Sequence, residues 1–396
     1  MSRVPAIRFK GFTDPWEQRK LGNFGEVAMC KRIYKDQTAE NGDVPFFKIG
    51  TFGGEPDAFI SEELFEDYRE RFSFPKRGTL LVSAAGSIGR IVEYQGQKAY
   101  FQDSNIVWLE HGGNLDDGFL KQLYSKIKWG LEGSTIKRLY NKDILDAEVV
   151  IPEVTEQIQI GAFFLQLDHL ITLHQRKYDK LCTVKKSMLD KMFPKPGEFV
   201  PEIRFEGFTD PWEQRKLGEV ASLLGGNAWS SKEYDPSGDY LVITIANVTG
   251  EYEVDDSEGN RINVNGNSEY LLSHGDILVS LTGNVGRVSR MTSTKAVLNQ
   301  RVGKLSVDCD IDDEFIFQAI RDGRFLTTME TASQGAAQKN ISNSDVLSFE
   351  LLLPTLKEQQ VVGEALHRID TLITLHQRKL ELLKNIKKSL LDKMFV

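Results

Sequence analysis

The sequence predicts an α+β protein in which two globular, mixed α/β domains are separated by two long antiparallel coiled-coil helices, arranged as a pseudo-twofold repeat. An eighteen-residue segment occurs at 5–22 and again at 201–218 with only two changes. Each copy is followed, much later in the chain, by a heptad pattern that ends in a shared LDKMF. The stretches between, 23–150 and 219–352, share only scattered positions. We call the repeated segments 5–22 and 201–218 the frame segments. Nearly identical frame segments beside two dissimilar stretches indicate two domains that do similar work on different targets.

The composition is that of a globular protein with room for two or three domains. Hydrophobic residues make up 40% and charged residues 27% of the 396 positions, enough for apolar cores. The N-terminus MSRVPAIRFK has no apolar signal region, and no uninterrupted apolar run approaches membrane-spanning length. Cys30, Cys182 and Cys309 lie far apart without metal-ligand spacing. These features predict a protein of the reducing cytoplasm.

The net charge of −8 counts against a simple nucleic-acid binder, because phosphate contacts need lysine and arginine. Residues 23–150 carry 16 Lys and Arg against 20 Asp and Glu, and residues 219–352 carry 10 against 20. Any surface that faces DNA must therefore be a local basic patch on an acidic domain.

The repeated opening segment contains a helix-capping pattern. Asp14 can cap a short helix that has Pro15 at its first position and ends at Gly22, and the second copy repeats the pattern. A turn is equally compatible with these residues. Trp16 and Trp212 are expected to anchor packing.

Inside the variable stretches a common scaffold survives. GTLLVSAAGSIGR at 78–90 and GDILVSLTGNVGR at 275–287 share seven of thirteen residues. Each predicts a strand, a glycine-bearing turn and a returning strand. Neither is a phosphate loop, because no Lys-Ser or Lys-Thr follows the glycines. Arg90 and Arg287, just beyond the turn, are candidate phosphate or base contacts.

A second shared block, at 133–152 and 335–354, places basic and small polar residues ahead of an aspartate and a strand-like run. Asp143 and Asp345 are expected to cap a short turn. The loop ahead of them is a candidate binding loop, because loops on rigid scaffolds carry binding residues disproportionately. Asn and Gln suit adenine and Arg suits guanine; a solvated loop is the alternative for any one of these residues. With Arg90 and Arg287, the candidate DNA-binding residues are Ser104, Asn105, Lys137 and Arg138 in the first domain and Asn299, Gln300, Arg301, Lys339 and Asn340 in the second.

One arm after each variable stretch shows heptad periodicity over about 33 residues, which is about 50 Å of helix. Two ordinary amphipathic helices on separate cores are the alternative, but the apolar stripe is narrow and its flanks are strongly charged. The predicted coiled-coil seam contains Ile160, Phe164, Leu167, Ile171, His174, Tyr178, Leu181 and Met188 in the first arm, and Val362, Leu366, Ile369, Ile373, His376, Leu380, Leu383 and Leu390 in the second.

The polar residues on the seam favour one orientation. In a parallel pair Lys185 would face Lys387, and like charges on a seam are unfavourable. His174 would likewise face His376. The pattern therefore predicts an antiparallel pair in which His174 lies beside Leu380, Tyr178 beside His376 and Lys185 beside Ile369. Both lysine heads would reach outward. The histidines are expected to pack in the core and to bind no metal.

The proline-rich run PKPGEFVPE must end the first arm. The predicted organisation is a first globular domain with its frame segment at 1–150, a first helical arm at 151–193, a linker at 194–200, a second globular domain with the repeated frame at 201–352 and a second arm at 353–396.

No catalytic constellation is recognisable. The sequence has no Asn-Pro-Pro-Tyr or Asp-Pro-Pro-Tyr run, no Walker A loop, no His-Glu-x-x-His helix and no Gly-x-Ser-x-Gly elbow. The chain is therefore expected to be a recognition component, without a catalytic residue or a metal site of its own.

The whole chain resembles the DNA-specificity subunits of type I restriction–modification systems, in the subclass with two near-equivalent halves. The resemblance lies in the repeated GFTDPWEQRKLG, in the helix starts IPEVTEQIQIGAFF and LPTLKEQQVVGEAL, and in the arm segments LITLHQRK and LDKMF. It implies that each variable stretch is a target-recognition domain for one half of a bipartite double-stranded DNA sequence. The arms would set the distance between the halves.

The same resemblance implies partners. The frames would dock two methyltransferase (modification) subunits, and ATP-dependent restriction subunits would join the assembly. S-adenosylmethionine, ATP and Mg would belong to those partners, and this chain would bind no cofactor. Two alternatives remain: a non-catalytic protein–protein scaffold with two divergent binding domains on a coiled-coil spacer, and a two-domain enzyme whose acid, base or nucleophile cannot be named.

Overall fold

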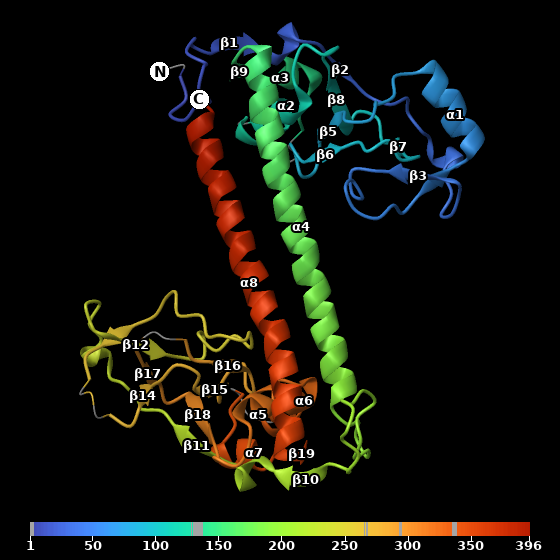
Figure 1. Ribbon diagram of the computed structural model, residues 1–396. Helices are drawn as coiled ribbons and strands as arrows, with labels where there is room; N and C mark the ends of the chain where they lie inside the picture. Colours follow the sequence, from blue (N-terminus) through green and yellow to red (C-terminus); the bar gives the residue numbers. More distant parts are fainter. Residues whose placement is uncertain are drawn as a thin grey trace. The chain divides into compact units, whose positions relative to one another are not determined.

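The computed structural model describes residues 4–127, 129, 138–264, 266, 268–292, 295–334 and 339–396 (Figure 1). The chain forms two compact units. The first unit comprises Met1–Leu173 with Leu380–Val396, and the second comprises His174–Lys379. Within the described residues, no helix is long and apolar enough to cross a membrane.

The described residues of the first unit form three small sheets, with strand orders β2-β8-β5-β6, β4-β3-β7 and β1-β9. Its helices and strands are β1 (Glu17–Lys20), β2 (Glu26–Ala28), β3 (Val44–Phe47), β4 (Phe59–Ile60), α1 (Glu62–Arg71), β5 (Leu80–Ser83), β6 (Ile91–Glu93), β7 (Tyr100–Phe101), β8 (Ile106–Glu110), α2 (Asp117–Lys126), α3 (Asn141–Leu145), β9 (Glu148–Ile151) and the start of α4 (Val154–Met192), with single 3-10 turns at Leu21–Asn23 and Lys35–Gln37.

The second unit repeats this plan, with strand orders β11-β18-β15-β16, β13-β12-β17-β14 and β10-β19. Its elements are β10 (Glu213–Lys216), β11 (Ala221–Gly225), β12 (Tyr240–Ile243), β13 (Arg261–Ile262), β14 (Leu271–Leu272), β15 (Ile277–Ser280), β16 (Val288–Arg290), β17 (Ala296–Leu298), β18 (Val302–Val307), α5 (Asp313–Ala319), α6 (Gly323–Ala332), α7 (Asn343–Leu347), β19 (Glu350–Leu353) and the start of α8 (Leu356–Met394), with 3-10 turns at Leu217–Glu219 and Ser231–Glu233.

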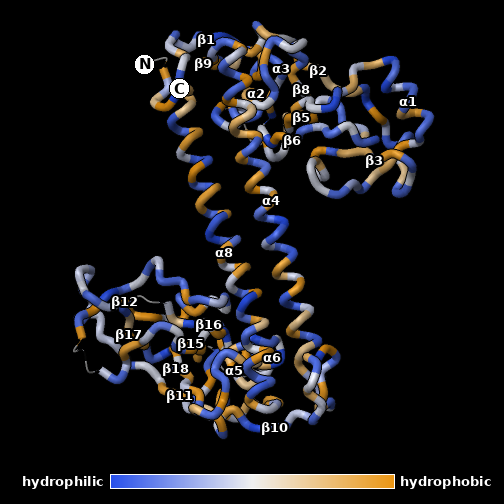
Figure 2. The backbone as a smooth tube through the Cα atoms, viewed as in Figure 1, coloured by the Kyte–Doolittle hydropathy of each residue, from blue (hydrophilic) through white to orange (hydrophobic). Residues whose placement is uncertain are grey.

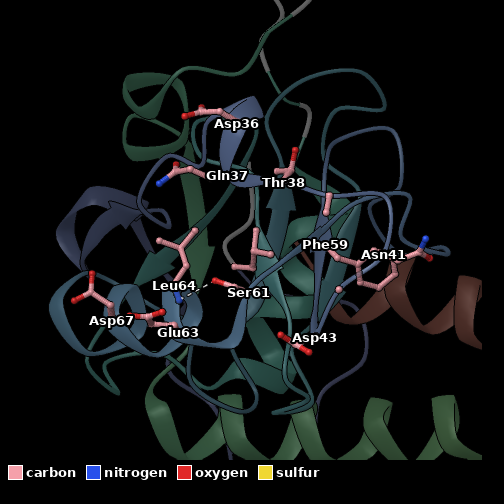
Figure 3. A pocket seen from close by; sticks show the side chains of 13 residues that line it. Asp36, Gln37, Thr38, Asn41, Asp43, Phe59, Ser61, Glu63, Leu64 and Asp67 are labelled. Carbon is pink, nitrogen blue, oxygen red and sulfur yellow. Dashed lines mark hydrogen bonds between the residues drawn. The ribbon is translucent and has the colours of Figure 1, made fainter.

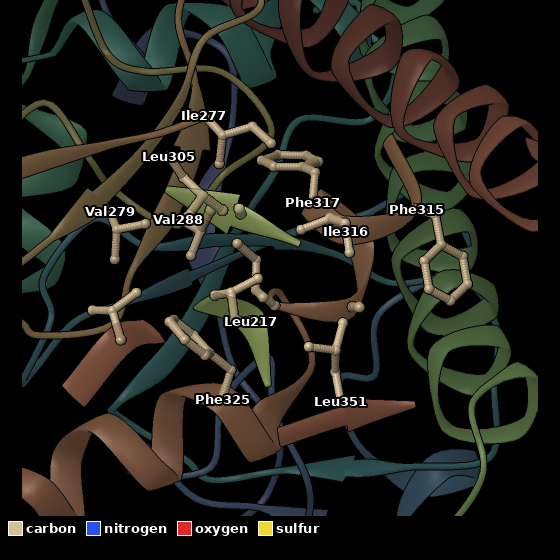
Figure 4. Packing of buried hydrophobic residues seen from close by; sticks show 14 of the residues in the cluster. Leu217, Ile277, Val279, Val288, Leu305, Phe315, Ile316, Phe317, Phe325 and Leu351 are labelled. Atoms are coloured by element: carbon tan, nitrogen blue, oxygen red, sulfur yellow. The ribbon is translucent and has the colours of Figure 1, made fainter. Parts of the chain in front are cut away.

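Strand β15 lies between two of the hydrophobic cores of the second unit. All four of its residues are buried. Ile277 and Val279 point into one cluster, which Figure 4 shows together with Phe325, whereas Leu278 packs into another cluster with Val302. Successive side chains of a strand point to opposite faces, so a continuous apolar run serves a strand that is covered on both sides. Strand β5 does the same in the first unit.

The frame segments form strands, so the capped short helix is wrong for this stretch. Strand β1 pairs antiparallel with β9, with Glu17 opposite Ile151, and β10 pairs with β19 in the same way. These pairings give the backbone the hydrogen-bond partners that a short helix would have supplied internally. Trp16 and Trp212 are only 1% and 2% exposed, which confirms them as packing anchors.

Each frame is tied to the N-terminus of a long helix by a buried ion pair. Arg8 donates to both carboxylate oxygens of Glu156 at 2.7 Å, and Arg204 binds Glu358 in the same fork at 2.7 and 2.8 Å. Both glutamates lie in the first helical turn, where the helix dipole also favours a negative charge. The frame segment therefore positions the start of the helix that follows its domain.

The end of each long helix packs under a frame as well. In the first unit the ring of Phe395, just beyond α8, lies 6.0 Å from Trp16. In the second unit the ring of Phe193, just beyond α4, lies 5.8 Å from Trp212. The repeated LDKMF segment is thus a core element of both units.

Helices α4 and α8 are each 39 residues long and pack antiparallel in both units, as predicted. Figure 2 shows hydrophobic and hydrophilic residues alternating along both. All residues of the predicted seam are buried or partly buried. The predicted register, however, is wrong in one respect: His174 lies against His376, with their Nδ1 atoms 2.8 Å apart, a contact expected only of a parallel pair. Burial, together with nearby positive charges, lowers the pKa of His174.

The expectation that the seam lysines reach outward is also wrong. Lys185 is 10% exposed and pairs with Asp370, which also accepts hydrogen bonds from Gln318 at 2.8 Å and Arg321 at 3.2 Å. Burial and the charge of Arg321 lower the pKa of Lys185 to about 8. A buried ammonium needs a carboxylate close by, and the aspartate that supplies it lies next to the predicted partner Ile369 on α8.

The first unit contains the equivalent pair in a more open setting. Lys387 binds Asp168 at 2.6 Å, with 25% and 23% of the two side chains exposed. Within the described residues no second cation contacts Asp168; Gln122 approaches it at 3.4 Å. The two pairs thus have the same residue types and different burial.

Replacing Asp370 with Asn should destabilise the second unit by about 3–5 kcal/mol, because Lys185 and Arg321 would lose the carboxylate that their burial requires. The matched Asp168→Asn variant should lose about 1 kcal/mol or less, since Lys387 reaches water. Amide hydrogen exchange along α4 and α8 measures both values. Equal losses at the two sites would contradict the assigned difference in burial.

Candidate nucleic-acid interface

The two sequence blocks shared by the variable domains come together in space in each unit. The first block forms the predicted hairpin: β5 pairs antiparallel with β6, and β15 pairs with β16. Gly86 and Gly283 at the turns have φ values of 63° and 73°, a left-handed conformation that favours glycine. The strand–turn–strand prediction is therefore confirmed.

A buried serine holds each hairpin turn closed. The Ser280 hydroxyl donates to the Asn284 carbonyl and accepts from the Arg287 N–H at 3.0 Å. Ser83 makes the same contacts, donating to the Ser87 carbonyl and accepting from the Arg90 N–H at 2.9 Å. The turn geometry is thus fixed by one side chain that lies in the core, whereas the residues at its tip can vary.

The second block lies beside the turn. The Leu139 N–H donates to the Ala84 carbonyl at 2.8 Å, and Ile341 donates to Leu281 at 2.9 Å. Single β-bridges join Ala85 to Arg138 and Thr282 to Asn340. Arg138 and Asn340 therefore occupy equivalent places on two backbones that follow the same path.

The residues at the start of strand β8 in the first unit, and of β18 in the second, form the third segment at the hairpin turn. The Ala84 N–H donates to the Asn105 carbonyl at 2.7 Å, and Leu281 donates to Arg301 at 2.9 Å. Ser83 is opposite Ile106 in its sheet and Ser280 is opposite Val302, which makes Asn105 the counterpart of Arg301. Three segments that are distant in the sequence thus meet at the hairpin tip.

The expected capping aspartates are confirmed. Asp143 accepts from the Tyr140 N–H and Asp345 accepts from the Ser342 N–H, both at 2.7 Å. Each aspartate sits at the third position of a five-residue helix, α3 or α7. The caps fix the direction in which the loop leaves the hairpin tip and enters β9 or β19.

In the first unit, Ser104, Asn105 and Arg138 come together at the tip. Arg138 donates to the Ser104 carbonyl at 3.3 Å. Arg90 lies at the far end of the turn, is exposed, and donates to the Gly53 carbonyl at 3.1 Å. Lys137 lies outside the described residues.

In the second unit, Asn299, Gln300 and Arg301 form one contiguous stretch beside Asn340. Gln300, Arg301 and Asn340 are exposed. The Asn340 Oδ1 accepts from the Thr282 hydroxyl at 3.0 Å, which leaves its amide nitrogen for an outside acceptor.

Two further candidates of the second unit lie at the edges of this group. Lys339 is exposed and makes a 3.3 Å ion pair with Glu330. Arg287 is half-buried at the end of the turn. The structure thus gathers most of the predicted residues of the second unit at one hairpin turn, and Arg287 lies at the end of that turn.

Sequence reasoning missed residues that join the first-unit group from elsewhere. Arg32 donates through Nε to Asp103 at 2.8 Å and remains 58% exposed. Tyr140 is 62% exposed and lies beside Arg138. An ion pair between residues that far apart in the chain leaves no periodic signal, so only the tertiary structure reveals it.

One acidic hollow in the first unit does not suit DNA. This cavity of about 690 Å³ is lined by Asp36, Asp43, Glu63 and Asp67, as Figure 3 shows. Carboxylates would repel phosphate, so this face is expected to lie away from a duplex. Among the described residues no cluster of His, Cys, Asp and Glu could hold a metal ion.

The sequence matches the family described as the type I restriction modification DNA specificity domain over residues 13–182 and again over 209–385. Two copies of a DNA-specificity domain define the class of protein to which this fold belongs. The chain is a member of that family, and it has the organisation of a type I restriction–modification specificity subunit.

Individual relatives agree. The chain is 51% identical over 143 residues to a putative type I restriction enzyme specificity subunit of Haemophilus influenzae, a match that covers 36% of this chain and 37% of that relative. It is 24% identical to the MjaVIII specificity subunit of Methanocaldococcus jannaschii, over 79% of this chain and 77% of that one. The crystal structure of an S subunit from M. genitalium aligns with a TM-score of 0.67 over 99% of each chain, at 16% identity, and so shares the fold.

Replacing Ser280 with Ala should destabilise the second unit by about 1–3 kcal/mol, because the Asn284 carbonyl and the Arg287 N–H would lose their shared partner. Ser222→Ala, at an exposed position of β11, is the matched control and should change stability by about 0.5 kcal/mol or less. Thermal unfolding measures both. If the two variants unfold alike, Ser280 does not hold the turn.

Proposed function

We propose that this chain is the sequence-reading component of a type I restriction–modification complex, in which each variable domain reads one half of a bipartite DNA target. One observation carries the proposal. The two units present different side chains, such as Arg138 and Asn340, from the same place on the same backbone scaffold. A common scaffold with exchanged polar side chains suits two readers of different sequences.

The chemistry of the gathered residues supports base readout. Guanidinium groups match the two acceptors of guanine, and Asn or Gln amides match the donor and acceptor of adenine. These side chains lie beside a hairpin tip and a capped loop. The rigid backbone there fixes their positions before DNA binds. Positioning contacts to phosphate would come from the exposed lysines and arginines of the same segments.

The frames support docking of two like partners. Strands β1 and β10 have the identical sequence EQRK, and all of these residues except Arg215 are exposed. Two copies of one partner need two equivalent surfaces, and these strands provide them. We therefore assign the frames to two methyltransferase subunits, with ATP-dependent restriction subunits joining the assembly.

The chain itself would do no chemistry in this assembly. The methyl donor S-adenosylmethionine, and the ATP and Mg of the restriction reaction, would be bound by the partner subunits. The net charge of −8 is also compatible with DNA binding by the whole complex, since partner subunits can supply part of the phosphate contact that an acidic chain lacks.

The acidic balance equally suits a protein–protein scaffold, which is the second candidate function. In that case the two variable domains would bind two different proteins, and exchanging a domain would leave DNA methylation unchanged.

Replacing residues 23–150 with the variable domain of another specificity subunit should change one half of the methylated motif and leave the other half intact. The reciprocal replacement of 219–352 should change only the opposite half. The measurement is the genome-wide map of methylated adenines in cells that express the chain with its methyltransferase partner. A change in both halves would refute modular reading, and no change in either would favour the scaffold.

Inserting one heptad into α4 and one into α8 at equivalent places should lengthen the unread spacer of the target by about three base pairs. Seven residues add about 10 Å of helix at 1.5 Å per residue, and base pairs are about 3.4 Å apart. The same methylation map reads the result. An unaltered spacer would show that the two helices do not set the distance between half-sites.

A further inference from the structure

An unusual turn at Ser104 in the first unit is clamped by two arginines. Ser104 has a φ of 57° and is, in the part of the chain that the structure describes, the one non-glycine residue with positive φ. Such a conformation is unfavourable for a residue with a Cβ and persists only where its surroundings impose it. Here Arg138 donates to the Ser104 carbonyl at 3.3 Å, and the Ser104 hydroxyl donates to Asp103 at 2.9 Å.

Asp103 connects this turn to Arg32. The same carboxylate oxygen that accepts from Ser104 accepts from the Nε of Arg32 at 2.8 Å. Asp103 is 15% exposed and Arg32 is 58% exposed. The carboxylate of Asp103 is thus largely buried, whereas the guanidinium of Arg32 is exposed to solvent. Because the bond to Asp103 uses Nε, the two Nη groups remain to bind an outside acceptor pair in a planar fork.

Two exposed tyrosines accompany the arginines, one near Arg32 in the sequence and one beside Arg138 in space. Tyr34 is 58% exposed and follows Arg32 by two positions, and Tyr140 is 62% exposed. The Arg138 guanidinium lies 6.0 Å from the centre of the Tyr140 ring. The ring of an exposed tyrosine offers a flat face on which a base can stack. The group therefore combines fixed cations with stacking surfaces.

The second unit has none of these groups at the equivalent places. The strand registers make Asn299 the counterpart of Asp103 and Gln300 that of Ser104. Strands β2 and β11 pair in the same register, with Ala28 equivalent to Leu224, and the residue four positions further along is Arg32 in the first unit and Ala228 in the second. Asn340 takes the place of Arg138. The clamp is thus a property of the first variable domain and not of the shared scaffold.

We propose that Arg32 and Arg138 form a guanine-binding site in the first variable domain, with Asp103 as the positioning residue of Arg32. The inference rests on the proposed function and adds to it the base class that one half-site must contain. Guanine presents two adjacent acceptors in the major groove, and a guanidinium held by a carboxylate on its Nε side meets them through its Nη groups without reorienting.

The test uses the full chain with its methyltransferase partner and the genome-wide map of methylated motifs. Arg32→Ala should relax one G·C position of the half-site that changes when residues 23–150 are replaced, with discrimination reduced roughly 5- to 150-fold. Asp103→Asn should relax the same position. The double variant should be no worse than Arg32→Ala, because Asp103 acts through Arg32, whereas a purely structural role would make the losses add.

Two further variants keep the test sharp. Arg32→Lys retains the charge and the ion pair but lacks the planar fork, so it should relax the same position even if Arg32→Ala folds poorly. Arg71→Ala removes an exposed arginine that is paired with Asp67 on α1 of the same domain, and it should leave the motif intact.

The outcomes separate two failures. A wild-type motif without a G·C pair in that half-site, or full discrimination in Arg32→Lys or Arg32→Ala, would overturn the guanine site while leaving bipartite reading in place. A wild-type complex that methylates no bipartite motif would overturn the proposed function itself.

Discussion

The fold depends on one packing constraint: each compact unit is completed by the end of a long helix that begins in the other. Phe395 closes the core around Trp16, and Phe193 closes the core around Trp212. Deleting either helix end would expose the largest buried ring of the corresponding frame, and aromatic burial is among the largest single contributions to a core. Neither half of the chain therefore contains all of its own core, and the strict repeat of LDKMF follows from that requirement.

The same constraint explains where the two halves are alike and where they differ. The repeated residues form the contacts that join frame to helix, such as the forks between Arg8 and Glu156 and between Arg204 and Glu358. At the hairpin tip of each variable domain the segments are joined instead by backbone hydrogen bonds, and the one side chain that both turns require is the buried serine, Ser83 or Ser280. Other side chains there can change without loss of the scaffold, as recognition of different targets requires.

Burial gives the two interhelical ion pairs different characters. Lys185 and Asp370 lie in the interior of the second unit with Arg321 beside them, whereas Lys387 and Asp168 remain partly in contact with water. A pair taken out of water is weak support for stability but strongly specifies which residues must meet, since any other register leaves a charge unpaired. The pairs therefore help to set the register of α4 against α8.

Local pattern determined much of this protein: the repeated frames, the long antiparallel helices, the hairpins and the capping aspartates all follow from periodicity, turn chemistry and spacing within one segment. Tertiary structure alone decided the rest. The frame became a strand because β9 lies beside it, Lys185 turned inward because Asp370 is there, and Arg32 joined the candidate interface through Asp103. Each of these outcomes depends on a contact with a residue that is distant in the chain. Such contacts have no characteristic spacing in the sequence, so the sequence pattern does not predict them.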